Sequence, residues 1–229
     1  MAKTTRSGSG LVRMTLAEQA YEALKERILD QTLPAGARLN IDGLARDLEV
    51  SSSPIREALA RLEAEKLVVM ELFLGYSVAP NPTAEYIDNL LDYRILTESY
   101  CARIGAARRS AEVIRILRQA TQRMATVDHI GTRYREYQKF ILADNLFHQT
   151  LVDSAGNQVF SNTYASLHVI ILQSRLYVRR DGGGSASLVV SEHQAILKAF
   201  EAGDGDAAAN AVNHHLEAGR RRLVPLAAS

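Results

Sequence analysis

The chain has 229 residues, of which 47% are hydrophobic, so it can form one large domain or two modest ones with buried cores. The formal net charge of +1 excludes a chain that is strongly basic throughout, and any case for nucleic-acid binding must therefore rest on local pattern. The single cysteine, Cys101, excludes an internal disulfide and is typical of a reducing, cytoplasmic environment, and no apolar run reaches the about 18 residues that a membrane span requires.

The first part of the sequence begins with a tail and an amphipathic helix. Residues 1–10 are basic and polar and lack the apolar segment of a secretory signal, so we expect a disordered tail. Thr15 and Glu18 have the spacing of a capping box at the start of a first helix. Pro34 and Gly36 then mark a turn.

Two more helices and a hairpin follow this turn. Asn40 can cap a short second helix, and a third helix is expected from Pro54 to about Lys66, because proline is favoured in the first turn of a helix. The β-prone runs 67–72 and 75–80 then indicate a hairpin. Three helices and a hairpin in about 65 residues predict a winged helix-turn-helix.

The rest of the chain is predicted to be helical, which makes the fold mainly α. Two of the five prolines lie in "APNPT", and we expect a winged helix-turn-helix DNA-binding domain at 11–79, a linker at 80–83 and an all-helical bundle at 84–229. Glycine-containing breaks separate the predicted helices of the bundle, which span residues 83–108, 110–127, 132–155, 157–180, 187–202 and 205–223.

The start of the third helix is the candidate DNA-reading segment. Ser51, Ser52 and Ser53 precede it, and they can either cap the helix or bond to phosphate. Arg56 projects from the first turn, where it can read a guanine edge or hold a phosphate, and Arg61 lies where it meets the DNA backbone. The alternative is a surface helix in which the serines only cap and the arginines pair with neighbouring glutamates.

At this point the sequence resembles the DNA-binding half of the GntR family of bacterial regulators. The resemblance extends over "LPAGARLNIDGLARDLEVSSSPIREALARLEAEKLV" and the following "GYSVA". The positions that match the family pattern are Leu33, Pro34, Gly36, Leu39, Leu44, Ala45, Val50, Ser51, Pro54, Arg56, Glu57, Ala58, Leu59, Leu62 and Glu63. The resemblance implies a winged helix-turn-helix that docks on double-stranded DNA and whose wing contributes Gly75 and Tyr76.

The sequence departs from the family pattern at four positions. The family usually has arginine where this chain has Ser52, and often a basic residue where it has Asp42. Glycine is usual at the positions of Glu49 and Lys66. The fold and the docking mode are therefore expected to carry over, whereas the base preference need not.

Polar side chains lie within the apolar face of the helix predicted at 132–155. When residues 137–155 are projected on a helix, Asp144 and His148 fall near the centre of an otherwise apolar stripe, at positions i and i+4. Ionisable groups inside a buried stripe are costly unless they are paired or bound to a metal.

Two later helices repeat this anomaly. His193 shares a face with apolar residues, and His215 lies inside the stripe of the last helix, whereas His214 points away from it. A single inward histidine is usually an ordinary core residue, but three histidines and an aspartate suit Zn, Ni, Mn or Fe. An all-helical bundle can build such a site from facing helices.

Residues 83–223 resemble the FCD ligand-binding domain of the FadR subgroup of GntR regulators, in its shorter, VanR-like six-helix form. The resemblance rests on an Asp-x-x-x-His helix, the "SAGN" break, a segment of the form "EH..IL.A...GD" and a terminal "HL". It implies one divalent metal ion, bound by Asp144, His148, His193 and His215.

A metal with four protein ligands can keep a position for water, and a small carboxylate can replace that water. Arg94 and Arg175 can hold the far carboxylate oxygen, because arginine makes bidentate pairs, and His168 lies two turns before Arg175 on the same face. For these three residues, an ordinary salt bridge or a packed polar side chain is an equally good interpretation.

These features predict a metabolite-responsive bacterial transcriptional regulator, acting as a repressor, rather than an enzyme. We expect a homodimer whose two heads read an inverted repeat in double-stranded DNA, with a small carboxylate as effector. The alternatives are a direct metal sensor and, less favoured, a metal-dependent hydrolase, for which no carboxylate is placed as an obvious general base.

Overall fold

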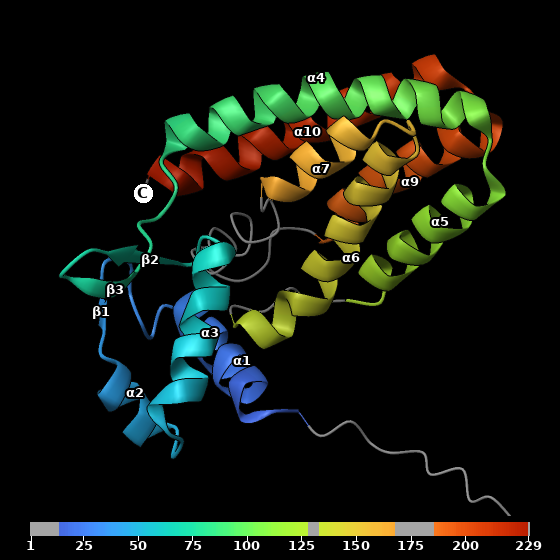
Figure 1. Cartoon of the computed structure of the whole chain (residues 1–229). Coiled ribbons are helices and arrows are strands. Elements are labelled where there is room, and N and C mark those ends of the chain that lie inside the picture. The colour runs from blue at the N-terminus through green and yellow to red at the C-terminus, as the bar shows by residue number, and fades with distance from the viewer. Residues whose placement is uncertain (1–13, 128–132, 168–185, 229) are drawn as a thin grey trace, which may run out of the picture.

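The computed structural model of the protein describes residues 14–127, 133–167 and 186–228. It confirms the predicted fold class, a mainly helical chain with an N-terminal winged helix-turn-helix and a C-terminal all-helical domain (Figure 1). In the part of the chain that the structure describes, no helix is long and apolar enough to cross a membrane.

The winged domain contains three helices and a three-stranded sheet. Its helices are α1 (Leu16–Leu29), α2 (Ile41–Asp47) and α3 (Ser52–Ala64), and its strands are β1 (Arg38–Leu39), β2 (Val68–Glu71) and β3 (Gly75–Val78). The strands are antiparallel, in the order β1-β3-β2. Leu24, Ile55, Leu59 and Leu62 pack between the helices and are fully buried.

Local sequence signals account for most of the helix starts. Both hydrogen bonds of the Thr15–Glu18 capping box are present, and Asn40 accepts a hydrogen bond from the Gly43 amide at 2.8 Å. Helix α3 begins at Ser52, two residues before Pro54, because the first turn of a helix needs no backbone donor and accepts proline at more than one position.

Strand β1 was not predicted from the sequence. It has only two residues, too few to show an alternating pattern, and Arg38 and Leu39 lie opposite Ser77 and Tyr76 of β3. The turn that contains Gly36 brings the chain back along β3, so that tertiary proximity, not propensity, makes it a strand. Its effect is to place Arg38 beside the wing.

The C-terminal domain consists of helices throughout its described residues. These are α4 (Ala84–Arg108), α5 (Ala111–Ala125), α6 (Tyr134–Asp153), α7 (Gln158–Ser166), α9 (Ala186–Ala202) and α10 (Gly205–Ala228). The last helix continues through Pro225, beyond the predicted end at residue 223. Of the helix predicted at 157–180, the structure describes α7, and the remainder lies outside the described residues.

Helices α4 and α10 are the two longest and run side by side along one edge of the domain, with α6 and α9 beneath them (Figure 1). Gly105 of α4 lies so close to α6 that an added Cβ would fall 1.7 Å from Ser154 Oγ. This close approach holds the last turn of α4 against the C-terminal end of α6.

The two domains contact each other where α1 ends and α6 begins. Asp30, the C-cap of α1, accepts a hydrogen bond from the backbone amide of Tyr134 at 2.6 Å. Arg135 forms a 2.7 Å ion pair with Glu26. The helix that carries Asp144 and His148 is therefore tied at its first turn to the DNA-binding domain.

Candidate metal centre and DNA-reading surface

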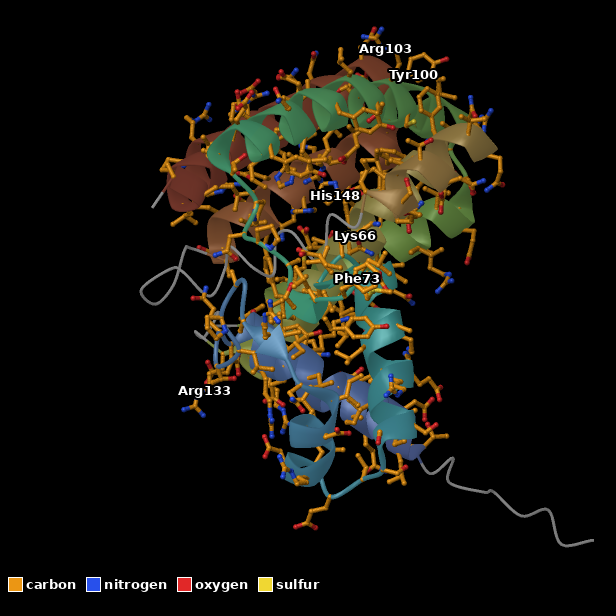
Figure 2. The ribbon with its side chains drawn as sticks, turned by 60° about the vertical axis from the view of Figure 1, so that its left-hand side comes forward. Lys66, Phe73, Tyr100, Arg103, Arg133 and His148 are labelled. Atoms are coloured by element: carbon orange, nitrogen blue, oxygen red, sulfur yellow. The ribbon has the colours of Figure 1, made fainter. Side chains whose placement is uncertain are left out.

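Helix α6 buries the polar pair that the helical projection placed in its apolar stripe. Asp144 is 6% exposed and His148 is 1% exposed. The apolar residues predicted for the same stripe are buried around them, namely Tyr137, Phe140, Ile141, Leu151 and Val152. The polar pair therefore lies within the core of the domain, and Figure 2 labels His148 there.

Helices α9 and α10 bring two more imidazoles to the same place. His193 and His215 are buried, whereas the neighbouring His214 is exposed, as its position off the stripe predicted. The Nε2 atom of His148 lies 3.3 Å from that of His193 and 3.2 Å from that of His215. An oxygen of Asp144 lies 3.2 Å from His193 Nε2 and 3.8 Å from His148 Nε2.

The outer nitrogen of each ring fixes its tautomer. The Nδ1 atoms all have acceptor partners: Glu98 for His148 at 2.6 Å, the Val189 carbonyl for His193 at 2.8 Å, and Glu192 for His215 at 2.7 Å. Because these carboxylate and carbonyl oxygens only accept, each Nδ1 carries the proton, and the Nε2 lone pairs face one another. Three lone pairs that converge repel each other unless a cation lies between them, and the histidine triad can therefore hold a metal ion.

The acidic groups of the centre are held in their charged form. Burial by itself raises the pKa of Glu98, but the charge of Arg94 and the contact with His148 outweigh it and leave this pKa at about 2. The same competition favours ionisation at Asp144, where burial raises the pKa and the surrounding histidines lower it well below its ordinary value. The centre thus presents anionic carboxylates beside three imidazoles, a set of groups that suits a divalent cation.

The surroundings of His215 favour the neutral ring. Burial and the nearby His193 lower the pKa of His215 to about 3, although its hydrogen bond to Glu192 opposes this shift. Glu192 in turn accepts two hydrogen bonds from Arg222, at 2.7 and 2.8 Å. A neutral ring, oriented by a carboxylate that an arginine holds in place, is the form that binds metal.

Arg94, predicted as an effector ligand, is buried next to this centre. Its Nε donates to Glu98 at 2.5 Å, and its guanidinium lies 5.9 Å from the centre of the Tyr164 ring. Its Nη2 is buried and has no hydrogen-bond partner among the described residues. The other predicted effector residues, His168 and Arg175, lie outside the described residues.

The start of α3 presents unpaired polar groups to solvent. Ser51 is the N-cap of α3, yet its hydroxyl makes no capping hydrogen bond, which leaves it available to an external acceptor or donor. Arg56 is exposed and has no ion pair within the described part of the chain. Ser52, which is half-buried, and Ser53, which is exposed, precede it in the first turn of the helix. The interpretation that this helix is merely a capped, salt-bridged surface helix is therefore not supported.

The remaining candidate DNA-contacting residues divide between the wing and the contact of α3 with α1. Gly75 and Tyr76 lie on β3, in the wall of a groove of about 610 Å³ that also contains Arg56. Arg61 is exposed, and its guanidinium lies 4.0 Å from the centre of the Tyr21 ring on α1. We therefore assign Arg61 to packing between α1 and α3 in this conformation.

Comparison with known families agrees with this two-part architecture. Residues 16–72 match the bacterial regulatory proteins of the gntR family, and residues 89–218 match the FCD domain. The chain belongs to the GntR family of bacterial regulators and has an FCD domain. It is thus a transcriptional regulator and not an enzyme, which removes the hydrolase alternative.

The relatives of this GntR regulator have the same overall extent. The chain is 28% identical over 197 residues to the HTH-type transcriptional regulator YdhC of Bacillus subtilis (strain 168), covering 86% of each chain. It is 27% identical over 188 residues to the gluconate operon transcriptional repressor of Bacillus licheniformis, covering 80% of this chain and 74% of the relative. A solved GntR regulator from Rhodococcus sp. RHA1 has the same fold, with a TM-score of 0.66, 24% identity, and coverage of 91% of this chain and 97% of that one.

The departures from the usual GntR pattern have a structural consequence. Glu49 and Lys66, which stand where glycine is usual, have φ angles of 54° and 63°. Both are in the left-handed region that glycine enters without steric cost, so the backbone at these two positions is strained in this chain.

Sequence reasoning missed the residues that support the metal centre. Glu98 lies four residues after Arg94, within the buried face of α4 between Leu91 and Cys101, and this spacing is a signal that could have identified it. Glu192 and Arg222 gave no comparable signal, because they meet only when α9 and α10 pack together.

Proposed function

We propose that this protein is a metabolite-responsive repressor, located in the cytoplasm, whose FCD domain binds one divalent metal ion through Asp144, His148, His193 and His215. Zn²⁺ is our first candidate, since three imidazoles and a carboxylate suit it, and Ni, Mn and Fe are alternatives. When bound, the metal supplies a Lewis-acidic position for an oxygen ligand.

One observation carries the metal assignment, namely the convergence of three Nε2 lone pairs whose Nδ1 atoms are all committed as donors. Without a cation, this arrangement places repelling acceptors 3.2–3.3 Å apart in a buried site. With a cation, the same lone pairs become ligands, and the hydrogen bonds from Nδ1 to Glu98, Glu192 and the Val189 carbonyl orient the rings.

We propose a small carboxylate as the effector. A metal with four protein ligands retains room for one further oxygen donor, and a carboxylate oxygen can fill it in place of water. Arg94 supports this choice, because its buried Nη2, next to the centre, lacks a hydrogen-bond partner among the described residues. His168 and Arg175 remain candidates from the sequence for the other carboxylate oxygen.

For DNA binding, we propose that α3 enters the major groove with Arg56 at a base edge and Ser51, Ser52 and Ser53 at phosphates. The exposure of Arg56 and the uncapped hydroxyl of Ser51 support this assignment. Gly75 and Tyr76 belong to the same surface through the groove that they share with Arg56. Arg61 contributes indirectly, by holding α3 against Tyr21.

The protein contains one DNA-reading head, and we propose that it acts as a homodimer on an inverted repeat. The outer side of α4 is the surface that we assign to the dimer. Leu96 and Tyr100, one turn apart, are 73% and 53% exposed, and Figure 2 shows Tyr100 and Arg103 on the side of the domain facing away from His148. The division into domains at residues 80–83 stays a prediction.

Helix α6 is the proposed route from effector to DNA. It carries Asp144 and His148 in its middle, and its first turn is held by Asp30 of the winged domain. A ligand that shifts the metal moves α6 along its axis or tilts it. The hydrogen bond between Tyr134 and Asp30 transmits this movement of α6 to α1. Repression itself is proposed by analogy, because a similar relative is named as the repressor of a gluconate operon.

Two measurements on the purified full-length protein test this function. Elemental analysis after purification without chelator should find about one divalent metal per chain. Selection from a random DNA pool should yield an inverted repeat, whose affinity should change when a panel of small carboxylic acids is added to the metal-loaded protein. A protein that retains no metal and selects no sequence would overturn the proposal.

A direct metal sensor is the second candidate, favoured by the direct connection between the metal-bearing helix and Asp30. The same assay separates the two. DNA binding that depends on metal alone, with no response to any carboxylate, supports the sensor.

A further inference from the structure

The turn of the wing has the most exposed apolar residues of the winged domain. Leu72 and Phe73, which lie between β2 and β3, are 74% and 97% exposed, and Leu74 and Met70 are about half exposed. A hydrogen bond from the Leu74 amide to the Glu71 carbonyl, 3.1 Å long, closes the turn. In Figure 1 this turn is the outermost point of the winged domain, and Figure 2 labels Phe73 on the side brought forward.

The backbone at the tip is strained in a way that increases this exposure. Phe73 has a φ angle of 66°, a conformation that glycine and asparagine accept readily and that a bulky aromatic residue rarely adopts. This arrangement has two free-energy costs: the left-handed backbone is strained, and the apolar ring is exposed to water. Such a combination marks a functional position.

The apolar tip is continuous with the surface proposed to read DNA. Residues 70–76 form one wall of the 610 Å³ groove, and Arg38 and Arg56 lie in it as well. Met70 lies opposite Tyr76 in the hairpin, so both face the groove that separates the wing from α3. If α3 occupies a major groove, the tip of the wing therefore lies on the side of the protein that faces the DNA.

The charges around the tip favour DNA over an apolar protein partner. Two arginines and one carboxylate, Glu71, line the groove. Neither arginine has an ion pair in the described part of the chain, and phosphates on both sides of a minor groove would neutralise them. Proteins that bind the minor groove often insert apolar side chains between base pairs and thereby kink the duplex.

We propose that Phe73, flanked by Leu72 and Leu74, is a wedge that enters the minor groove beside each half-site and partly unstacks one base step. Pyrimidine–purine steps deform most easily, so the wedge selects such a step at a position where no side chain reads the bases. The inference rests on the DNA binding proposed above and adds a distortion of the operator and a residue responsible for it.

The test uses full-length protein and DNA selected by the wild type from a random pool. 2-Aminopurine, whose fluorescence rises on unstacking, is placed in turn at each step flanking a half-site, and bending is measured by gel mobility. We expect wild-type protein to raise fluorescence at one step and to bend the DNA. Phe73→Ala should abolish both effects and weaken operator binding roughly tenfold, with non-specific binding unchanged.

Two controls keep the outcomes distinct. Val159→Ala removes another exposed apolar side chain, 73% exposed, from α7 and should change neither signal. Phe73→Leu should keep part of the fluorescence rise, because it keeps an apolar wedge. If Phe73→Ala raises 2-aminopurine fluorescence as much as the wild type does, the wedge is overturned. Sedimentation without DNA gives a second test. If the wild type self-associates and Phe73→Ala does not, the tip contacts a second copy of the chain, and the wedge is overturned as well. If the wild type selects no sequence, the proposed function fails as well.

Discussion

The proposed metal centre and the proposed DNA-reading surface use polar side chains in opposite ways. In the FCD domain, buried polar groups hold one another, as in the chain of contacts from Arg94 through Glu98 to His148. On the winged domain, Ser51 and Arg56 lie at the surface without such partners in the part of the chain that the structure describes. The centre is organised before its ligand arrives, whereas the DNA-reading side chains are left free for the ligand to order.

This difference has a physical reason. A buried charge without partners costs several kcal/mol, so a site in a core must be assembled fully during folding. A surface group is solvated when it is free, and it contributes mainly when DNA replaces water. Changes in the FCD centre should therefore affect stability and metal binding together, and changes on α3 should affect DNA binding with little effect on stability.

The largest effect is expected at the ligands of the metal. His148→Ala or His215→Ala should remove bound metal and lower the free energy of unfolding by about 3 kcal/mol or more at a metal concentration about a hundred times the dissociation constant. His214→Ala is the matched control and should retain both. Elemental analysis and thermal unfolding of the three variants measure this, and equal stability in all three would make these rings ordinary core residues.

The residues behind the ligands should have a smaller effect on the same quantities. Glu98→Gln keeps an acceptor for His148 but removes the charge that pairs with Arg94, and metal affinity should fall about tenfold to a hundredfold. Competition with a fluorescent chelator measures the change. Glu112→Gln, which disrupts an exposed ion pair on α5, is the control, and if it lowered affinity equally the effect would not be local.

On the winged domain, Arg56→Ala should weaken operator binding by about 1–3 kcal/mol while leaving metal content and unfolding temperature unchanged. Arg61→Ala is the informative partner, because its guanidinium stacks on Tyr21. It should lower stability by about 0.5–1 kcal/mol and affect DNA binding less. Titration of labelled operator and chemical denaturation separate the two, and the reverse result would show that the docking register is wrong.

The smallest effect concerns the strained backbone of the winged domain. Lys66→Gly should raise stability by about 0.5–1 kcal/mol, since the residue is exposed and has a left-handed backbone that glycine adopts freely. Lys66→Ala keeps the steric cost and should not stabilise. Urea denaturation of both variants tests this, and a gain in the alanine variant alone would assign the effect to charge.

Much of the fold could be predicted from the sequence, because its signals are local. The capping box at Thr15, the cap at Asn40 and the helical periodicity around Asp144 and His148 each involve residues within a few positions of one another. The inward direction of His193 and His215, and the outward direction of His214, follow from the same periodicity. A helix has a fixed turn, so that spacing alone determines which side chains share a face.

Only the tertiary structure decided how those faces meet. It brought three Nε2 atoms together from α6, α9 and α10, placed Glu98 behind His148, and set the Arg61 guanidinium over the Tyr21 ring. It also made a strand of Arg38 and Leu39 and set Phe73 in solvent on a left-handed backbone. These outcomes depend on contacts between segments far apart in the chain, where the packing of whole helices and the burial of charge outweigh any local preference.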